Sequence, residues 1–533
     1  MSRAKLSSIT LAAFKSHAKP SRIPLAPLTV VVGRNNSGKS SVIQALLLLK
    51  QTLQSPRSDI PLHIEGYVDA LSLRELTYGW PSPSDYVEGP TFSVQWESIV
   101  DIDGALERAL RPDLDTLINT ANLRSIESQI RGGGSMRVVT ELKLEFAEVQ
   151  GRTVLERATV ESSTAPDALI VTASYLVERN SDGLYQCRWN DDLADRITVE
   201  LEHFLPYLEI DRRNLGPRHG HRSLHNAFVL LFAEPLDDLK SLLTRFSYLG
   251  PMRDLPPTLY RPANAPSDDL GVSGQYAAQI LRAHRSDFVH YFAPVELDSS
   301  GNWTPSLRSK SLVAAVNDVF SSLGIESDLK IDDVMDVGFR LLFGKATLQH
   351  VGRGLSYLLP VVQLGLMADP FRFEQLPQAA SSQDYIRMAG FWPCAFEEPE
   401  AHLHPKVQSR LAHWLVALGM ANRQQIVETH SDHLVRRLRG LAAGSMEGSF
   451  VEQWLTTNVQ IVQTEQINGV TRVSCSRLTK DGGIESWPSD FMDESSNQEQ
   501  AIYYASLRKS EPGSPPESFE AKIVHADSGS QSK

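Results

Sequence analysis

The chain has few cysteines and no long apolar run. Its 533 residues include three cysteines, Cys187, Cys394 and Cys475, which are widely spaced and odd in number. Such cysteines predict neither a disulfide framework nor a zinc site. No segment approaches the length of about eighteen apolar residues that a membrane-spanning helix needs, and the first residues lack the apolar core and cleavage site of a signal peptide. We therefore expect a cytoplasmic protein with no membrane segment.

A sustained heptad repeat is also missing, which excludes a long coiled coil. The net charge is −12, and this argues against a surface dominated by nucleic-acid binding. Two local groups of basic residues, at 212–222 and 436–439, still leave DNA binding possible. With 41% hydrophobic residues the chain can bury large cores, and its length predicts about two to four domains.

One segment fits a phosphate-binding pattern. Residues 33–40 read Gly-Arg-Asn-Asn-Ser-Gly-Lys-Ser, which matches G-x-x-x-x-G-K-[ST] between an expected buried strand at 28–32 and an expected helix at 42–49. Backbone N–H groups of such a loop point at phosphates, and small residues let the backbone come close. We expect Lys39 to reach the β- and γ-phosphates of ATP and Ser40 to ligate Mg²⁺. The predicted nucleotide-binding residues of this segment are Gly33, Asn35, Asn36, Ser37, Gly38, Lys39, Ser40 and Ser41.

Two later strand ends carry polar side chains that a phosphate-cleaving site needs. The apolar run 392–396 ends in Glu397 and Glu398; the first acid would hold Mg²⁺ and the second would orient the attacking water. Another short strand, 425–427, precedes His430, which could hydrogen-bond the γ-phosphate or the water. Adjacent acids can also be a solvated strand end, and a lone histidine can be structural. The order of phosphate loop, acids and histidine favours a hydrolytic site with Glu398 and His430 as its catalytic residues.

These motifs resemble a known family. The segments VVGRNNSGKSSVIQALLLL, FEEPEAHLHP and ETHSDHL closely resemble the bacterial ATP-binding-cassette-type (ABC-type) ATPases related to RecF, to SMC heads and to the ATPase half of the overcoming-lysogenization-defect (OLD) nucleases. KLSSITLAAFKSH is similar to the first strand and the Phe-Lys-Ser turn of that family. YLGPMRDLPP and GGIESWPSDFMDE are similar to segments of a subgroup of predicted AAA-type ATPases, many of them linked with phage defence. The resemblance implies an α/β fold, namely a P-loop NTPase head of the ABC type.

The resemblance also implies a second ligand loop and a dimer. ATP-binding cassettes complete each site with a signature loop from a second subunit, whose serine and glycine contact the γ-phosphate at a helix N-terminus. Residues 351–360 resemble this loop, with Gly352 and Gly354 giving close approach and Ser356 opening an apolar helix. Tyr357 replaces the polar residue that often follows the serine. A homodimer or higher oligomer that sandwiches ATP is therefore implied, and a glycine-rich helix start without a ligand remains the alternative for this segment.

The remaining segments predict the domain organisation. Short alternating runs between 137 and 189 predict an antiparallel β meander, and the pattern turns helical from about 204 to 323. The expected fold is thus an α/β ABC-type head with an antiparallel β subdomain and an inserted helical region. The expected parts are the N-terminal part of the head at 1–200, a mainly helical insertion at 201–330, the C-terminal part of the head at 331–508 and a disordered tail at 509–533.

The predicted function is a nucleotide-driven switch. Two heads would sandwich ATP and Mg²⁺, hydrolysis would separate them, and a partner protein or DNA would read the state. An effector such as a nuclease or toxin is the expected partner, in a DNA-linked process or in phage defence. The chain itself is not expected to cut DNA, because the segment after Leu434 is too short for the Toprim domain of OLD nucleases and has no Asp-x-Asp. Two alternatives stay open: a non-hydrolysing, nucleotide-gated scaffold that holds an effector, and the ATPase subunit of a membrane transporter.

Overall fold

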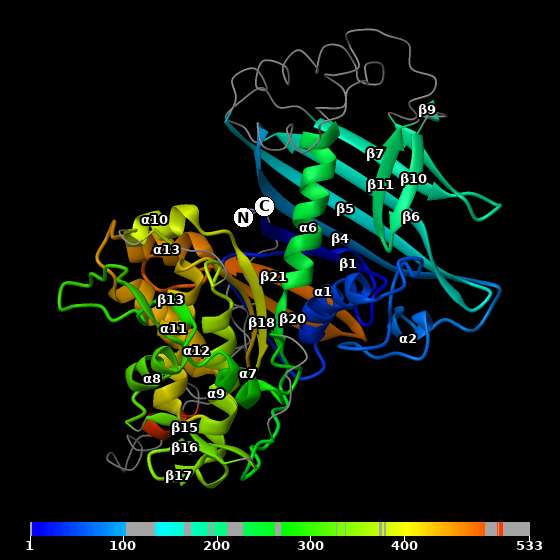
Figure 1. Cartoon of the computed structure of the whole chain (residues 1–533). Helices are drawn as coiled ribbons and strands as arrows, with labels where there is room; N and C mark the ends of the chain where they lie inside the picture. Colours follow the sequence, from blue (N-terminus) through cyan, green and yellow to red (C-terminus); the bar gives the residue numbers. More distant parts are fainter. Residues whose placement is uncertain are drawn as a thin grey trace, which may run out of the picture. The chain divides into compact units, whose positions relative to one another are not determined.

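The structure is a computed structural model (Figure 1). It describes residues 3–102, 134–164, 172–189, 192–193, 197–210, 228–261, 268–326, 328–335, 337–372, 376–377, 380–485, 498 and 500–504. The chain divides into a unit Met1–Ser486, which holds every element discussed below, and a unit Trp487–Lys533. The tail expected at 509–533 and the basic segment at 212–222 lie outside the described residues.

A six-stranded sheet positions the candidate site, with strand order β12-β18-β19-β3-β20-β21. Its strands are β12 (Ser247–Leu249), β18 (Trp392–Glu397), β19 (Arg423–Glu428), β3 (Leu28–Gly33), β20 (Val459–Ile467) and β21 (Val470–Arg477). All neighbours are parallel except β21, which pairs antiparallel with β20. All six residues of β3 are buried, as expected for an uninterrupted apolar run in the middle of a parallel sheet. Because parallel strands end at one edge, the ends of β3, β18 and β19 lie together.

A second sheet has eight strands and is antiparallel, with order β2-β1-β4-β5-β6-β7-β8-β9. Its strands are β1 (Lys5–Ala12), β2 (Ser21–Pro24), β4 (Tyr86–Asp101), β5 (Ser135–Val149), β6 (Arg152–Thr164), β7 (Thr172–Arg179), β8 (Tyr185–Trp189) and β9 (Asp192–Leu193). The predicted meander is confirmed, since Leu142, Leu144 and Phe146 alternate with less buried residues and are themselves buried. The π-helix η2 (Val229–Ala233) and α6 (Glu234–Arg245) contact this sheet.

Helices contact most strands of the central sheet. They are α1 (Lys39–Gln54), α9 (Arg353–Met367), α11 (Pro405–Met420) and α13 (Phe450–Asn458), and α12 (Asp432–Gly444) packs on α11 and α13. The N-terminal helix α1 contacts β3 and β19, and α11 contacts the same two strands. Apolar residues occupy most positions of α1 after its first turn, so this helix is buried on nearly every side. Among the described residues, no helix is both long enough and apolar enough to cross a membrane.

The range predicted as a mainly helical insertion, 201–330, contains both helices and strands. Its described part holds α6, α7 (Ala277–Ala283) and α8 (Leu312–Ser322), and also β12, which belongs to the central sheet. The other elements are α2 (Leu73–Leu76), β10 (Ile197–Glu202), β11 (Leu205–Ile210), β13 (Phe288–Phe292), β14 (Leu307–Ser311), β15 (Leu329–Val334), β16 (Gly338–Phe343), β17 (Ala346–Thr347), the 3-10 helix η3 (Leu348–His350) and α10 (Ser382–Met388). The exact domain boundaries stay predictions.

Candidate nucleotide-binding site

The phosphate loop joins β3 to α1 and lines a pocket of about 480 Å³. Gly38 has a φ of 94°, and a Cβ at this position would lie 2.4 Å from the Thr471 side chain. A Cβ at Gly33 would lie 2.4 Å from the Thr464 carbonyl oxygen. The β20–β21 hairpin therefore packs directly on the loop, and both glycines of the pattern are required by space as well as by conformation.

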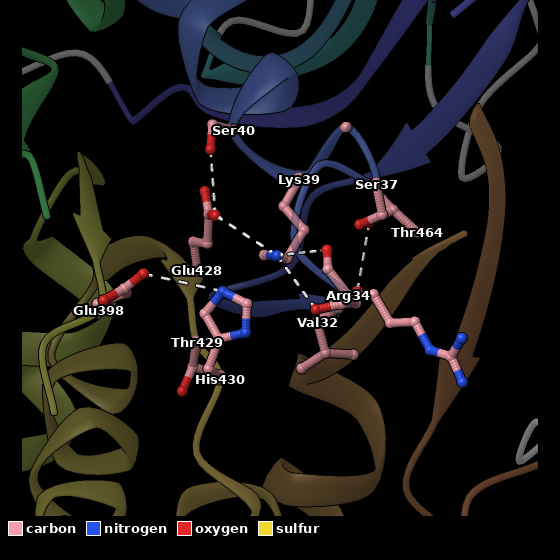
Figure 2. A network of polar contacts seen from close by, with 12 residues as sticks. Val32, Arg34, Ser37, Lys39, Ser40, Glu398, Glu428, Thr429, His430 and Thr464 are labelled. Atoms are coloured by element: carbon pink, nitrogen blue, oxygen red, sulfur yellow. Dashed lines mark hydrogen bonds and ion pairs between the residues drawn. The ribbon is translucent and has the colours of Figure 1, made fainter. Parts of the chain in front are cut away.

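The Lys39 side chain folds back along the loop (Figure 2). Its Nζ donates to the carbonyl oxygens of Gly33, at 3.1 Å, and Arg34, at 2.8 Å. Burial lowers the pKa of Lys39, and Glu428 and then Glu398 oppose that effect. The loop residues Asn35, Asn36, Ser37, Gly38, Lys39, Ser40 and Ser41 line the pocket as the pattern predicts. The loop can therefore offer backbone N–H groups and one ammonium to a polyphosphate.

The carboxylate that faces Ser40 belongs to Glu428, the last residue of β19. Ser40 Oγ donates to Glu428 Oε1 at 3.1 Å, and Lys39 Nζ lies 4.0 Å from the same oxygen. Burial, and next the charge of Glu397, raise the pKa of Glu428 to about 7. We did not predict a role for Glu428, although the sequence holds a signal for it. It ends its strand immediately before Thr429 and His430, as Glu397 ends β18.

Glu397 and Glu428 are paired residues at the ends of the neighbouring strands β18 and β19. Glu397 Oε1 accepts a hydrogen bond from the Tyr248 hydroxyl at 2.9 Å, and burial raises the pKa of Glu397. Glu397 is not among the described residues that line the pocket, whereas Glu428 and Glu398 are. Its assignment as an Mg²⁺ ligand stays a prediction.

Glu398 and His430 lie side by side at the pocket. Glu398 Oε1 is 3.8 Å from His430 Nε2, and Figure 2 shows the two side chains pointing toward each other. Glu398 adopts a left-handed conformation with a φ of 47°, and its N–H donates to the Glu428 carbonyl at 2.8 Å. Burial, and then the charge of Lys39, lower the pKa of His430. The two residues that the sequence selects as catalytic are thus in one place, and their chemical roles stay predictions.

A third acid holds the histidine segment in place. Glu400 is 5% exposed, and its Oε1 accepts from the Thr429 hydroxyl at 2.6 Å and from the His430 N–H at 3.0 Å.

Arg253 is also buried, and it donates to the Glu397 carbonyl at 2.9 Å. Burial lowers the pKa of Arg253 to about 10. The YLGPMRDLPP segment thus supports the acid-bearing strand through Tyr248 and Arg253.

The turn after β1 supplies further pocket residues that we did not select from the sequence. Lys15 and Ser16 line the pocket together with Gln44, and Lys15 Nζ donates to Gln44 Oε1 at 2.5 Å. Thr471 Oγ1 donates to the Ser37 carbonyl at 2.9 Å and also lies within hydrogen-bond distance of Ser16 Oγ, at 2.7 Å. The sequence contains a signal for these pocket residues, because the Phe-Lys-Ser turn is part of the family resemblance.

The signature-like loop begins α9 and does not line this pocket within the described part of the chain. Gly352 precedes the helix and is exposed, and a Cβ there would meet nothing within 4 Å. Gly354 packs against the His402 carbonyl, which would lie 2.7 Å from an added Cβ. Ser356 is 7% exposed, and its hydroxyl donates to the Leu348 carbonyl at 3.2 Å. This geometry gives Ser356 no free hydroxyl for a second copy, so its predicted phosphate contact lacks support and stays a prediction.

The arginines of α12 have partners within the chain. Arg436 pairs with Asp432 at 3.3 Å, Arg437 donates to His413, and Arg439 donates to the Gly482 carbonyl at 2.7 Å. These contacts do not add support for a DNA-binding patch at 436–439.

One family model matches the segments of the chain that carry the motifs of the site. Residues 5–110 and 393–435 match the AAA ATPase domain family. These segments contain the phosphate loop, both acids and His430. The match agrees with the predicted P-loop ATPase class, and the largely parallel sheet beside an antiparallel β subdomain confirms the predicted α/β fold. No protein of curated function matches the sequence.

Similar solved structures include SMC head domains. An SMC head bound to the C-winged helix domain of ScpA is 15% identical, with 89% of this chain and 98% of that chain covered and a TM-score of 0.39. The SMC head domain from Thermotoga maritima is 13% identical, with 88% of this chain and 98% of that chain covered and a TM-score of 0.31. An SMC head with an extended coiled coil, bound to the C-terminal domain of ScpA and derived from Pyrococcus furiosus, is 11% identical. The match covers 94% of this chain and 100% of that chain, with a TM-score of 0.35. At such identities and TM-scores these likenesses support no statement about activity.

Proposed function

We propose that this chain binds ATP with Mg²⁺ and hydrolyses it as a nucleotide-driven dimer switch. The observation that carries the proposal is the pocket itself, which is lined by the phosphate loop, Glu398, Glu428 and His430. These groups come from the ends of β3, β18 and β19, so one sheet edge supplies phosphate binding, carboxylates and a histidine.

Each of these residues has a proposed task. The loop N–H groups and Lys39 bind the β- and γ-phosphates. Ser40 and the carboxylates at the strand ends are hard oxygen ligands of the kind that Mg²⁺ prefers, and the bound ion would offset the charge of the phosphates. Buried Glu428 Oε2 has no hydrogen-bond partner among the described residues, which fits a cation site. Glu398 orients the attacking water, and His430 donates to a γ-phosphate oxygen.

The dimer part of the proposal rests on the loop at the start of α9. Gly352 and Arg353 are exposed there, so a second head could bring a phosphate close to this helix N-terminus. Opening and closing of the dimer would be read by an effector protein such as a nuclease or toxin. The similarity of YLGPMRDLPP to defence-linked ATPases makes phage defence, or another DNA-linked process, the proposed setting.

Phosphate release from the purified protein tests the catalytic part. We expect ATP- and Mg²⁺-dependent turnover, and we expect Lys39→Ala to lose tight ATP binding while the protein keeps its fold. Unchanged ATP affinity in Lys39→Ala would refute the site. Tight ATP binding without any phosphate release would instead favour the non-hydrolysing scaffold.

A further inference from the structure

The Glu428 side chain is placed as a neighbour of Ser40 on a shared cation. In octahedral coordination with Mg–O distances of about 2.1 Å, two adjacent ligand oxygens lie about 3.0 Å apart. Ser40 Oγ and Glu428 Oε1 are 3.1 Å apart. The hydroxyl and the carboxylate oxygen therefore already have the separation of two neighbouring Mg²⁺ ligands.

The second oxygen of Glu428 lacks a hydrogen-bond partner in the described part of the chain. The residue is 5% exposed, and its Oε2 is buried without a hydrogen bond among the described residues. Its one ion-pair contact in the described part of the chain is Lys39, at 4.0 Å. Glu397 lies beside it on the next strand and adds a second negative charge. A buried carboxylate with so weak a counter-charge is costly, and a divalent cation in the pocket would remove that cost.

Glu397 is less well placed to contact the same ion. Its Oε1 is held by the Tyr248 hydroxyl, and it does not line the pocket within the described residues. We infer that Glu428, and not Glu397, supplies the carboxylate that binds the divalent cation next to Ser40. This inference rests on the proposed function, because it assigns a residue to the cation of that nucleotide site. Glu397 then acts from the outer shell, where it is oriented by Tyr248.

Binding of Mn²⁺, a spectroscopic substitute for Mg²⁺, tests the inference without any turnover. Electron paramagnetic resonance would measure free Mn²⁺ with the protein alone and with a non-hydrolysable ATP analogue. Loss of even a second-shell partner costs about 10–100-fold in metal affinity, so we expect Glu428→Gln to weaken Mn²⁺ binding by about tenfold or more. Glu397→Gln should have the smaller effect. The control is Glu465→Gln, which removes the same charge from an exposed residue of β20. Glu428→Gln with wild-type Mn²⁺ affinity would overturn the inference.

Further measurements separate a failure of this inference from a failure of the proposed function or of the fold. Binding of the ATP analogue in the presence of Mg²⁺ tests the nucleotide site as a whole, so its absence in the wild type refutes the proposed function. Mn²⁺ binding to the protein alone still tests Glu428 in that case. The metal-free Glu428→Gln protein should melt at or above the wild-type temperature, because a buried charge is removed. Ser40→Ala and Glu428→Gln should lose less affinity together than the sum of the two, since both act on one ion; full additivity would count against a shared cation.

Discussion

His413 should make the fold sensitive to acid. This α11 residue is 7% exposed, and its ring lies between the Val295 carbonyl and the Arg437 guanidinium of α12. A carbonyl only accepts, so Nδ1 carries the proton, and Nε2 accepts from Arg437. The neutral ring satisfies both partners. A second proton would remove the acceptor and place a positive charge against Arg437.

The size of the effect on stability follows from the shift in the pKa of His413. Burial, and then the charges of Arg437, lower the pKa of His413 from about 6.5 to about 4. The difference corresponds to about 3 kcal/mol of unfolding free energy. Because the folded-state pKa is depressed, this contribution is fully present above about pH 6.5, declines as the pH falls below that value, and is lost below about pH 4.

Urea unfolding at a series of pH values between 7 and 4 would measure the contribution of His413 to the unfolding free energy. His413→Gln should unfold more easily than the wild type at pH 7, because a buried hydrogen-bonded pair is disturbed. Its stability should fall much less between pH 6.5 and 4, because the titrating ring is gone. His350→Gln, at an exposed histidine, is the control and should follow the wild type. Parallel losses in His413→Gln and wild type across that range would refute the reasoning.

Two other predictions concern the proposed switch. Glu398→Gln should keep ATP and Mg²⁺ bound while slowing phosphate release by about two or more orders of magnitude; a wild-type rate would remove Glu398 from the chemistry. Gly352→Trp should leave ATP binding to the monomer unchanged, since a Cβ there meets nothing within 4 Å, but should prevent ATP-dependent dimers in size-exclusion chromatography. Gly440→Trp, at an equally open position on α12, is its control, and normal dimers in Gly352→Trp would argue against a composite site at that loop.

The local part of the site could be predicted from the sequence. The phosphate loop, its strand and its helix are contiguous, so pattern and spacing are enough to place Lys39 and Ser40 at the pocket. The strand ends carrying Glu398 and His430 were also recognisable, because short apolar runs ended in polar residues. Glu428 was not selected, since the pattern shows which acids end strands and not which carboxylate turns toward Ser40. That depends on the order of β18 and β19 in the sheet and on the Tyr248 hydroxyl, which holds Glu397.

The start of α9 shows a second limit of the sequence pattern. We expected Ser356 to open the helix, but the helix begins at Arg353. Three residues further along, close to one helical turn, the serine side chain is directed to the Leu348 carbonyl and is buried. A shift of a few residues in a helix boundary thus changes which side chains a second copy could reach.

The position of β3 has a consequence for synthesis on the ribosome. Both sheet neighbours of β3 are β19 and β20, and the loop that follows β3 packs on Thr464 and Thr471. All of these partners are made more than three hundred and eighty residues later, as the separation of 388 between Ser40 and Glu428 shows. During translation, β3 and its loop therefore have no native sheet neighbours until residues 423–471 have emerged, and the proposed nucleotide site stays incomplete until then. Under the proposed function, ATP would stabilise only chains in which these distant segments have already come together.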